Sequence, residues 1–188
     1  MPISPFPPAE LRGVAAPIRV LIRAALAAQG RRAGEIAVML LRDADLRALN
    51  REWRCIDRAT DVLSFSYDET GPGETLKPAG TRRSRRDRGR AVAATGAART
   101  GRRVNGDLAI SLDRMREQAH RYRVTPGREL ARLVIHGALH LAGLDHQRPA
   151  ERRHMRVRED AVIESQRGAV RALDRALERG SRAARSAS

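Results

Sequence analysis

The sequence of 188 residues is poor in cysteine, lysine and aromatic side chains. Its single cysteine, Cys55, excludes an internal disulfide and favours a reducing compartment. Aromatic residues make up 3% of the chain, too few for a surface that binds nucleobases mainly by stacking. No apolar run approaches the ~20 residues of a membrane-spanning helix, and the first residues, MPISPFPP, lack the regions of a secretory signal. We therefore expect a soluble, cytoplasmic protein.

Acidic residues are outnumbered by basic ones, 22 against 37, which gives a formal net charge of +15. Lys77 is the only lysine, so nearly all of the positive charge is arginine. Such a charge attracts polyanions, chiefly nucleic acid. A strong arginine and alanine bias is also a common result of GC-rich coding. The composition alone favours neither explanation.

The positive charge is concentrated in two segments. Residues 70–104 hold 10 basic and 2 acidic side chains, and residues 147–188 hold 11 and 6. The first segment includes the run RRSRRDRGR and has no helical or strand periodicity, so we expect a disordered insertion, which could also act as an arm that contacts RNA. We expect one domain over residues 1–165 and a helical or disordered basic tail over 166–188.

Hydrophobic periodicity predicts an α+β fold in which helices surround a small mixed sheet. The expected strands are short apolar runs, one of which follows the turn signal Asn105–Gly106. The predicted strands are residues 35–41, 61–67 and 107–111. The predicted helices are residues 17–29, 43–53, 112–121 and 127–142, followed by one long helix over about 149–179.

Three of the five histidines lie within the eleven residues HGALHLAGLDH. His136 and His140 are four residues apart in an apolar helix, so their side chains project from one face. Gly143 can turn the chain and bring His146 back toward them. Three imidazoles placed in this way form an open tripod for zinc, with a fourth position left for water. Asp145 could orient one of the rings, or it could be a simple turn carboxylate.

The same histidine spacing occurs in metzincin proteases, which need a glutamate directly after the first histidine as the general base. Gly137 stands at that position here. The nearest carboxylate on the same helix, Glu129, lies seven residues before His136. A metal-dependent peptidase at this site would lack its base, and it is therefore the second choice.

Three motifs resemble the YbeY family, bacterial endoribonucleases of rRNA maturation. LNREWRCIDRATDVLSF, residues 49–65, is similar to the family pattern LN-x3-R followed by T-[DN]-VLSF. NGDLAIS, residues 105–111, resembles the family's LGDI-x-IS strand. HGALHLAGLDH, residues 136–146, is similar to the family signature HG-x-LHL-x-G-YDH. Leu144 departs from this last pattern, because it replaces the usual tyrosine.

The resemblance implies a zinc-dependent endoribonuclease with one zinc per chain, at the end of a core helix. It implies cleavage of single-stranded RNA in 16S rRNA 3′-end maturation and ribosome quality control, with small-subunit components as partners. By the same resemblance His136, His140 and His146 are the metal ligands, and Arg54 contacts a substrate phosphate. Without the motif, Arg54 would be an ordinary arginine at a helix end that covers apolar surface.

The chemistry of these residues is compatible with that function. A zinc-bound water or hydroxide is the expected nucleophile, and an arginine can offset charge that builds on a phosphate. Asp61, Asp107 and Asp145 are the carboxylates that could transfer protons, and the sequence does not choose among them. A ribosome-assembly factor with a structural zinc is the non-enzymatic alternative, and the oligomeric state stays open.

Overall fold

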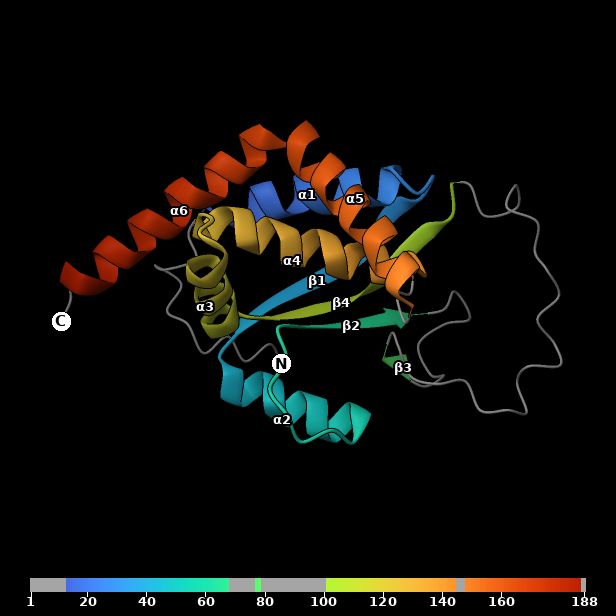
Figure 1. The fold of residues 1–188 in the computed structure, drawn as a ribbon, viewed down its shortest axis with the longest axis horizontal. Helices are drawn as coiled ribbons and strands as arrows, with labels where there is room; N and C mark the ends of the chain where they lie inside the picture. The colour runs from blue at the N-terminus through green and yellow to red at the C-terminus, as the bar shows by residue number, and fades with distance from the viewer. Residues whose placement is uncertain (1–12, 68–76, 79–100, 145–147, 187–188) are drawn as a thin grey trace, which may run out of the picture.

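The computed structural model describes residues 13–67, 77–78, 101–144 and 148–186. In these ranges six helices surround a four-stranded mixed sheet, so the predicted α+β class is confirmed (Figure 1). The strands lie in the order β1-β4-β2-β3. Their bounds are β1 Arg32–Leu41, β2 Val62–Tyr67, β3 Lys77–Pro78 and β4 Arg103–Ser111. The arginine-rich run Arg82–Arg90 lies outside the described residues. The predicted disordered insertion therefore stays a prediction.

Strand β4 is the centre of the sheet, with β1 parallel on one side and β2 antiparallel on the other. It begins earlier than predicted, because Asn105–Gly106 is part of the strand and not a turn. The register against β1 shifts at this point, and the Asn105 side chain accepts a hydrogen bond from the backbone nitrogen of Glu35 at 2.8 Å. A Cβ on Gly106 would lie 2.3 Å from the carbonyl oxygen of Phe65. The dipeptide therefore marks an irregularity in the sheet that needs a residue without a side chain.

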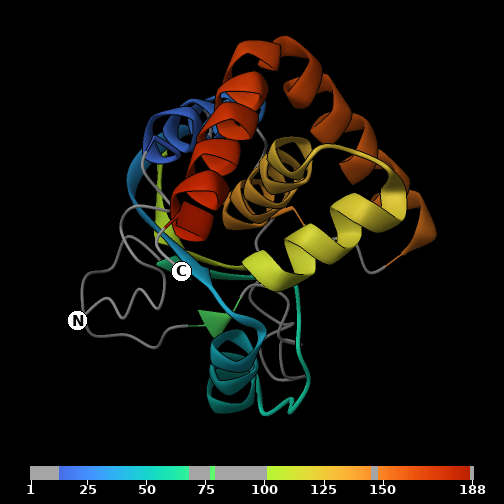
Figure 2. The same ribbon diagram turned by 90° about the vertical axis from the view of Figure 1, so that its left-hand side faces the viewer.

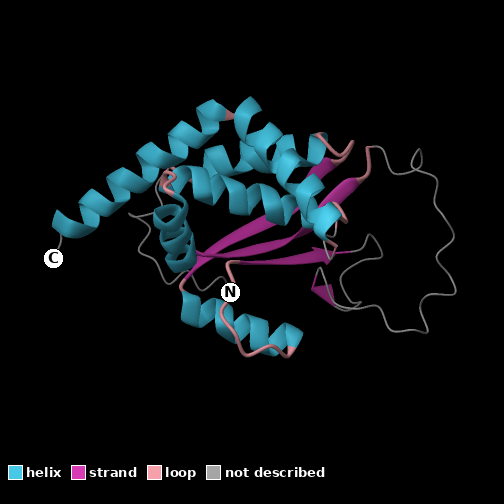
Figure 3. Cartoon of the chain, viewed as in Figure 1, coloured by secondary structure: helices cyan, strands magenta, loops and turns pink. Residues whose placement is uncertain are grey.

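Helix α4 (Pro126–Leu141) is the core of the molecule, and it lies on one face of the sheet (Figures 1 and 2). The other helices are α1 Ala15–Ala27, α2 Asp43–Arg54, α3 Leu112–Tyr122, α5 Pro149–Ser165 and α6 Arg167–Ser186. Leu108 and Ile110 of β4 belong to the cluster around α4, whereas Ala109 packs with Leu46 of α2. Alternate residues of one strand therefore hold helices on opposite faces of the sheet (Figure 3). No helix of the described ranges is long and apolar enough to cross a membrane.

The prediction of one long C-terminal helix is wrong. The chain leaves the helical conformation at Gln166 (φ −114°, ψ 30°), and α6 runs back over α4 and α1. The apolar residues keep the same helical period across the break, so the sequence pattern does not reveal it. A straight helix over 149–186 would extend ~57 Å. The break allows Val170, Leu173 and Ala176 to reach the same core as α5.

Asp174 of α6 caps the beginning of α4. Its carboxylate accepts hydrogen bonds from the backbone nitrogen of Gly127 at 2.7 Å and from the hydroxyl of Thr125 at 3.0 Å. Thr125 in turn accepts one from the backbone nitrogen of Arg128 at 3.2 Å. A Cβ on Gly127 would lie 2.4 Å from the Asp174 carboxylate. Glycine at this position therefore allows the contact between the two helices.

Replacing Asp174 by alanine should lower the free energy of unfolding by about 1–3 kcal/mol, because it leaves a buried backbone donor unsatisfied at a helix N-terminus. Urea denaturation measures the change. Asp174→Asn keeps an acceptor oxygen and is the matched control, with a smaller expected loss. Equal stability of the alanine variant and the wild type would show that the Asp174 cap does not stabilise the fold.

Candidate metal centre

Two of the three predicted metal ligands lie side by side on α4. The Nε2 atoms of His136 and His140 are 3.1 Å apart, and their rings meet edge to face with centroids 4.6 Å apart. The helix itself produces this arrangement, because residues four apart are one turn apart on the same face. Both side chains are half-buried, in contrast to the fully buried Ile135 and Leu139 beside them.

The separation of the two nitrogens fits a metal ion of the zinc class. Two nitrogens that each lie ~2.0–2.1 Å from a tetrahedral zinc ion are about 3.3 Å apart. The third predicted ligand, His146, and the neighbouring Asp145 lie outside the described residues. Among the residues that are described, no group of three His, Cys, Asp or Glu side chains is placed to hold a metal. The structure places His136 and His140 side by side, and the metal tripod stays a prediction.

Glu159 of α5 orients His136, a contact that the sequence patterns do not predict. One carboxylate oxygen lies 2.7 Å from Nδ1 of His136. Glu159 is only 5% exposed, and its contact with Nδ1 leaves Nε2 of the same ring facing His140. A signal for Glu159 existed, because it stands at helical spacing between the buried Met155 and Val162. A carboxylate on the buried face of a helix needs a partner.

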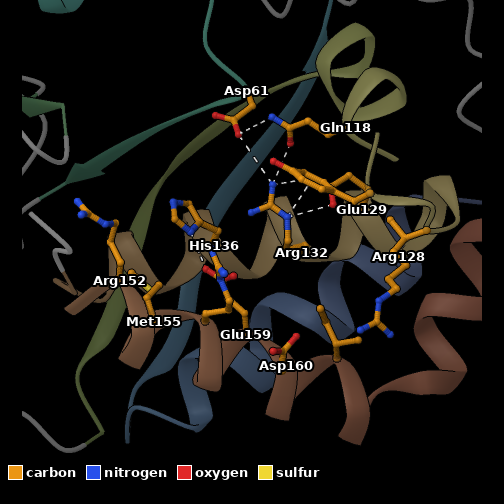
Figure 4. Close-up of a pocket in the computed structure, with 14 residues that line it drawn as sticks. Asp61, Gln118, Arg128, Glu129, Arg132, His136, Arg152, Met155, Glu159 and Asp160 are labelled. Carbon is orange, nitrogen blue, oxygen red and sulfur yellow. Dashed lines mark hydrogen bonds and ion pairs between the residues drawn. The ribbon is translucent and has the colours of Figure 1, made fainter. Parts of the chain in front are cut away.

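A cavity of about 460 Å³ opens beside His136, between α3, α4 and α5 (Figure 4). Glu129, 2% exposed, forms an ion pair at 2.6 Å with Arg132, whose guanidinium also donates to Gln118 at 3.0 Å. Burial alone would lower the pKa of Arg132, but the hydrogen bonds and charge of Glu129 outweigh it and raise that pKa above its usual value. Arg132 is therefore a fixed cation in the wall of the cavity.

Of the three carboxylates considered for proton transfer, the structure brings Asp61 into this cavity with His136. Its oxygens accept hydrogen bonds from the backbone nitrogen of Val62 at 3.0 Å and from Gln118 at 3.2 Å. Asp107 instead accepts a hydrogen bond from the hydroxyl of Tyr67. Burial, together with this hydrogen bond, raises the pKa of Tyr67 to about 12. Asp145 lies outside the described residues.

Arg54 is not among the residues that line the cavity. It is the last residue of α2, which packs on the opposite face of the sheet from α4 (Figure 2). Its side chain is half-buried, and its Nε is buried with no hydrogen-bond partner among the described residues. A buried donor without a partner is costly, and the structure does not bring this guanidinium to the cavity beside His136.

Gly137 faces the sheet and not the histidines. A Cβ there would lie 2.7 Å from Leu108 and 3.3 Å from the hydroxyl of Ser64, which donates a 3.4 Å hydrogen bond to the Gly137 carbonyl. Leu108 is fully buried and cannot move away cheaply. A glutamate at this position would enter the apolar core. The structure therefore has no room for the general base that a metzincin protease needs.

The family model and the curated relatives agree on one family. The family model described as Endoribonuclease YbeY matches residues 12–167. A relative from Anaeromyxobacter sp. strain Fw109-5, named Endoribonuclease YbeY, is 40% identical over 162 residues, which cover 85% of this chain and 69% of the relative. A relative of the same name from Chloroflexus aggregans is 39% identical over 130 residues, 69% of this chain and 71% of the relative. The solution structure of TM1509 from Thermotoga maritima aligns with a TM-score of 0.48 and 21% identity, covering 87% of this chain and 85% of that one.

Proposed function

Because the chain belongs to the YbeY family of endoribonucleases, we propose that it cleaves single-stranded RNA with the help of a metal ion bound by His136 and His140. The observation that carries the proposal is the pair of Nε2 atoms 3.1 Å apart, with Nδ1 of His136 held by Glu159 at 2.7 Å. One imidazole alone would be an ordinary half-buried histidine. Two that face each other, one of them oriented by a buried carboxylate, form the beginning of a metal site.

The proposed metal is zinc, one per chain, with His146 as the third ligand by the family resemblance. When bound, zinc supplies a Lewis acid that activates water at neutral pH. Glu159 fixes the tautomer and direction of His136 by accepting the proton of Nδ1. Imidazole nitrogens are ligands that zinc accepts readily.

Two arginines are proposed to act on the RNA backbone. By the family resemblance, Arg54 would contact a substrate phosphate through its guanidinium. Arg132 is held by Glu129 in the wall of the cavity, where it stabilises negative charge without moving. Asp61 is the carboxylate that we assign to the cavity, where Gln118 orients it. A role of Asp61 in proton transfer stays a prediction.

The biological role proposed here is the maturation of the 3′ end of 16S rRNA and the quality control of ribosomes in the cytoplasm. Components of the small ribosomal subunit are the proposed partners. These assignments rest on the resemblance of the motifs. The tight packing of Gly137 against β4 argues against the peptidase alternative, because it excludes a carboxylate beside the first histidine.

A cleavage assay tests the proposal. The zinc-loaded protein is incubated with a single-stranded RNA that spans the 3′ end of 16S rRNA and, separately, with casein, with and without a chelator. We expect chelator-sensitive cleavage of RNA, intact casein, and at least a tenfold loss of RNA cleavage in Arg54→Ala. Cleavage of casein alone would support the peptidase instead. Binding of RNA without cleavage would support the assembly factor.

A further inference from the structure

The rim of the cavity beside His136 carries exposed positive charge and one exposed aromatic ring. Arg128 of α4 and Arg152 and Arg156 of α5 line it and are exposed. Tyr122, the last residue of α3, also lines it and is 57% exposed. These residues come from three helices, and all four line the cavity. Figure 4 labels Arg128 and Arg152, which lie on opposite sides of the view.

The carboxylates inside the cavity are already paired. Glu129 is held by Arg132 at 2.6 Å, and Glu159 lies 2.7 Å from Nδ1 of His136. Both are buried, at 2% and 5% exposure. Asp160 is the exposed carboxylate among the lining residues, against three exposed arginines. Asp61 is half-buried, accepts a hydrogen bond from Gln118 at 3.2 Å and lies 3.9 Å from Arg132. The exposed side chains at the rim therefore carry an excess of positive charge.

The two arginines of α5 are placed on one side of that helix. Arg152 and Arg156 are four residues apart, one helical turn, and both line the cavity. Arg153 and Arg158 are exposed on the same helix but do not line it. Because the chain is rich in arginine, the presence of two arginine pairs on α5 needs no functional explanation. Only the first pair lies beside His136.

Tyr122 is the aromatic residue of this rim. Packing does not account for its position, because more than half of the side chain is exposed. The guanidinium carbon of Arg121 lies 5.7 Å from the centre of the ring, a cation–π distance that steadies it. An exposed ring next to several arginines is the combination that binds single-stranded nucleic acid, with bases on the ring and phosphates on the arginines.

We propose that this cavity is a subsite for single-stranded RNA next to the metal centre. An unpaired base stacks on Tyr122, and the neighbouring phosphates pair with Arg128, Arg152 and Arg156. The volume of about 460 Å³ is in the range of small-ligand sites. A paired base cannot stack on the ring, so the subsite selects single strands. This inference rests on the proposed nuclease function and adds the residues that hold the substrate.

The two pairs of arginines on α5 provide a matched test. Cleavage of a fluorescein-labelled single-stranded RNA of mixed sequence is measured with zinc-loaded wild type, Arg152→Ala/Arg156→Ala and Arg153→Ala/Arg158→Ala. The charge change is the same in both variants. The cavity pair should raise KM at least about fivefold with kcat within about twofold, and should reduce the slope of log(kcat/KM) against log salt by about 1.4. The control pair should leave KM within about twofold.

Two variants of Tyr122 test the stacking role. Tyr122→Phe keeps the ring and should keep the wild-type KM, whereas Tyr122→Ala should raise KM by roughly 5- to 100-fold. A duplex of the same RNA, measured as a competitor, should bind the wild type and Tyr122→Ala equally. Equal KM values for the alanine and phenylalanine variants would overturn the stacking role.

The outcomes separate this inference from the proposed function. If the wild type cleaves RNA and both arginine pairs change KM equally, the subsite is wrong and the nuclease stands. If the wild type does not cleave RNA, binding of the same RNA is measured by fluorescence anisotropy. Binding that depends on Arg152 and Arg156 but not on Arg153 and Arg158 would then support the subsite without the nuclease. Equal dependence on both pairs, or no binding, would overturn it.

Discussion

Purified His140→Ala protein is expected to lose stoichiometric zinc. Removal of a direct ligand should weaken zinc binding by more than the 10–100-fold that outer-shell changes cost. The Nε2 of His140 lies 3.1 Å from Nε2 of His136, so the variant would keep one of the two proposed ligands that the structure describes. Cleavage of single-stranded RNA should fall to the level seen with chelator. Metal analysis after dialysis and the RNA assay together measure both effects.

The control for this experiment is His154→Ala. His154 is exposed on α5 and does not line the cavity, so zinc content and RNA cleavage should stay at the wild-type level. Alanine is a good helix former, and His140 is half-buried near the end of α4, so the variant should fold. Unchanged zinc content in folded His140→Ala protein would refute the assignment of the site.

Changes at Glu159 are expected to act on the metal through His136. Glu159→Gln keeps an oxygen that can accept the proton of Nδ1 but removes the charge, and Glu159→Leu removes the acceptor. The affinity for zinc should fall in the order Glu, Gln, Leu, by about 10–100-fold in the leucine variant. Titration with a competing zinc chelator measures the affinity.

The activity of the Glu159 variants should recover when zinc is in excess, because Glu159 does not touch the substrate. This recovery distinguishes a residue that positions a ligand from one that is merely structural. Leucine at 159 could even stabilise the metal-free protein, because a buried carboxylate is costly and an apolar side chain is not. Identical zinc affinity in all three proteins would show that the 2.7 Å contact has no role in the site.

Local sequence patterns predicted the parts of the fold that depend on local geometry. The spacing of His136 and His140 placed both on one helical face, and the apolar run around them identified the core helix that became α4. The strand over residues 61–67 was placed to within one residue, since β2 is Val62–Tyr67. In each case the spacing of apolar residues within the segment is enough to distinguish a helix from a strand.

The parts that the sequence did not reveal depend on contacts between distant segments. The spacing of apolar residues does not change at Gln166, so it does not predict the break. The break depends on the packing of α6 against the core, which involves residues distant in the sequence. Glu159 is 23 residues from His136, and nothing in the spacing alone connects them. The low aromatic content of the chain does not point to Tyr122, although one exposed ring can stack on one base.

The position of His136 and His140 on α4 has a consequence for the entropy of metal binding. The backbone that carries both rings is in the most deeply buried helix of the described chain, packed against the sheet and four other helices. Segments of this kind open only when the whole molecule unfolds. The loss of conformational freedom that brings the two nitrogens within 3.1 Å has therefore already occurred when the chain folds. The proposed metal would find two of its ligands already in place.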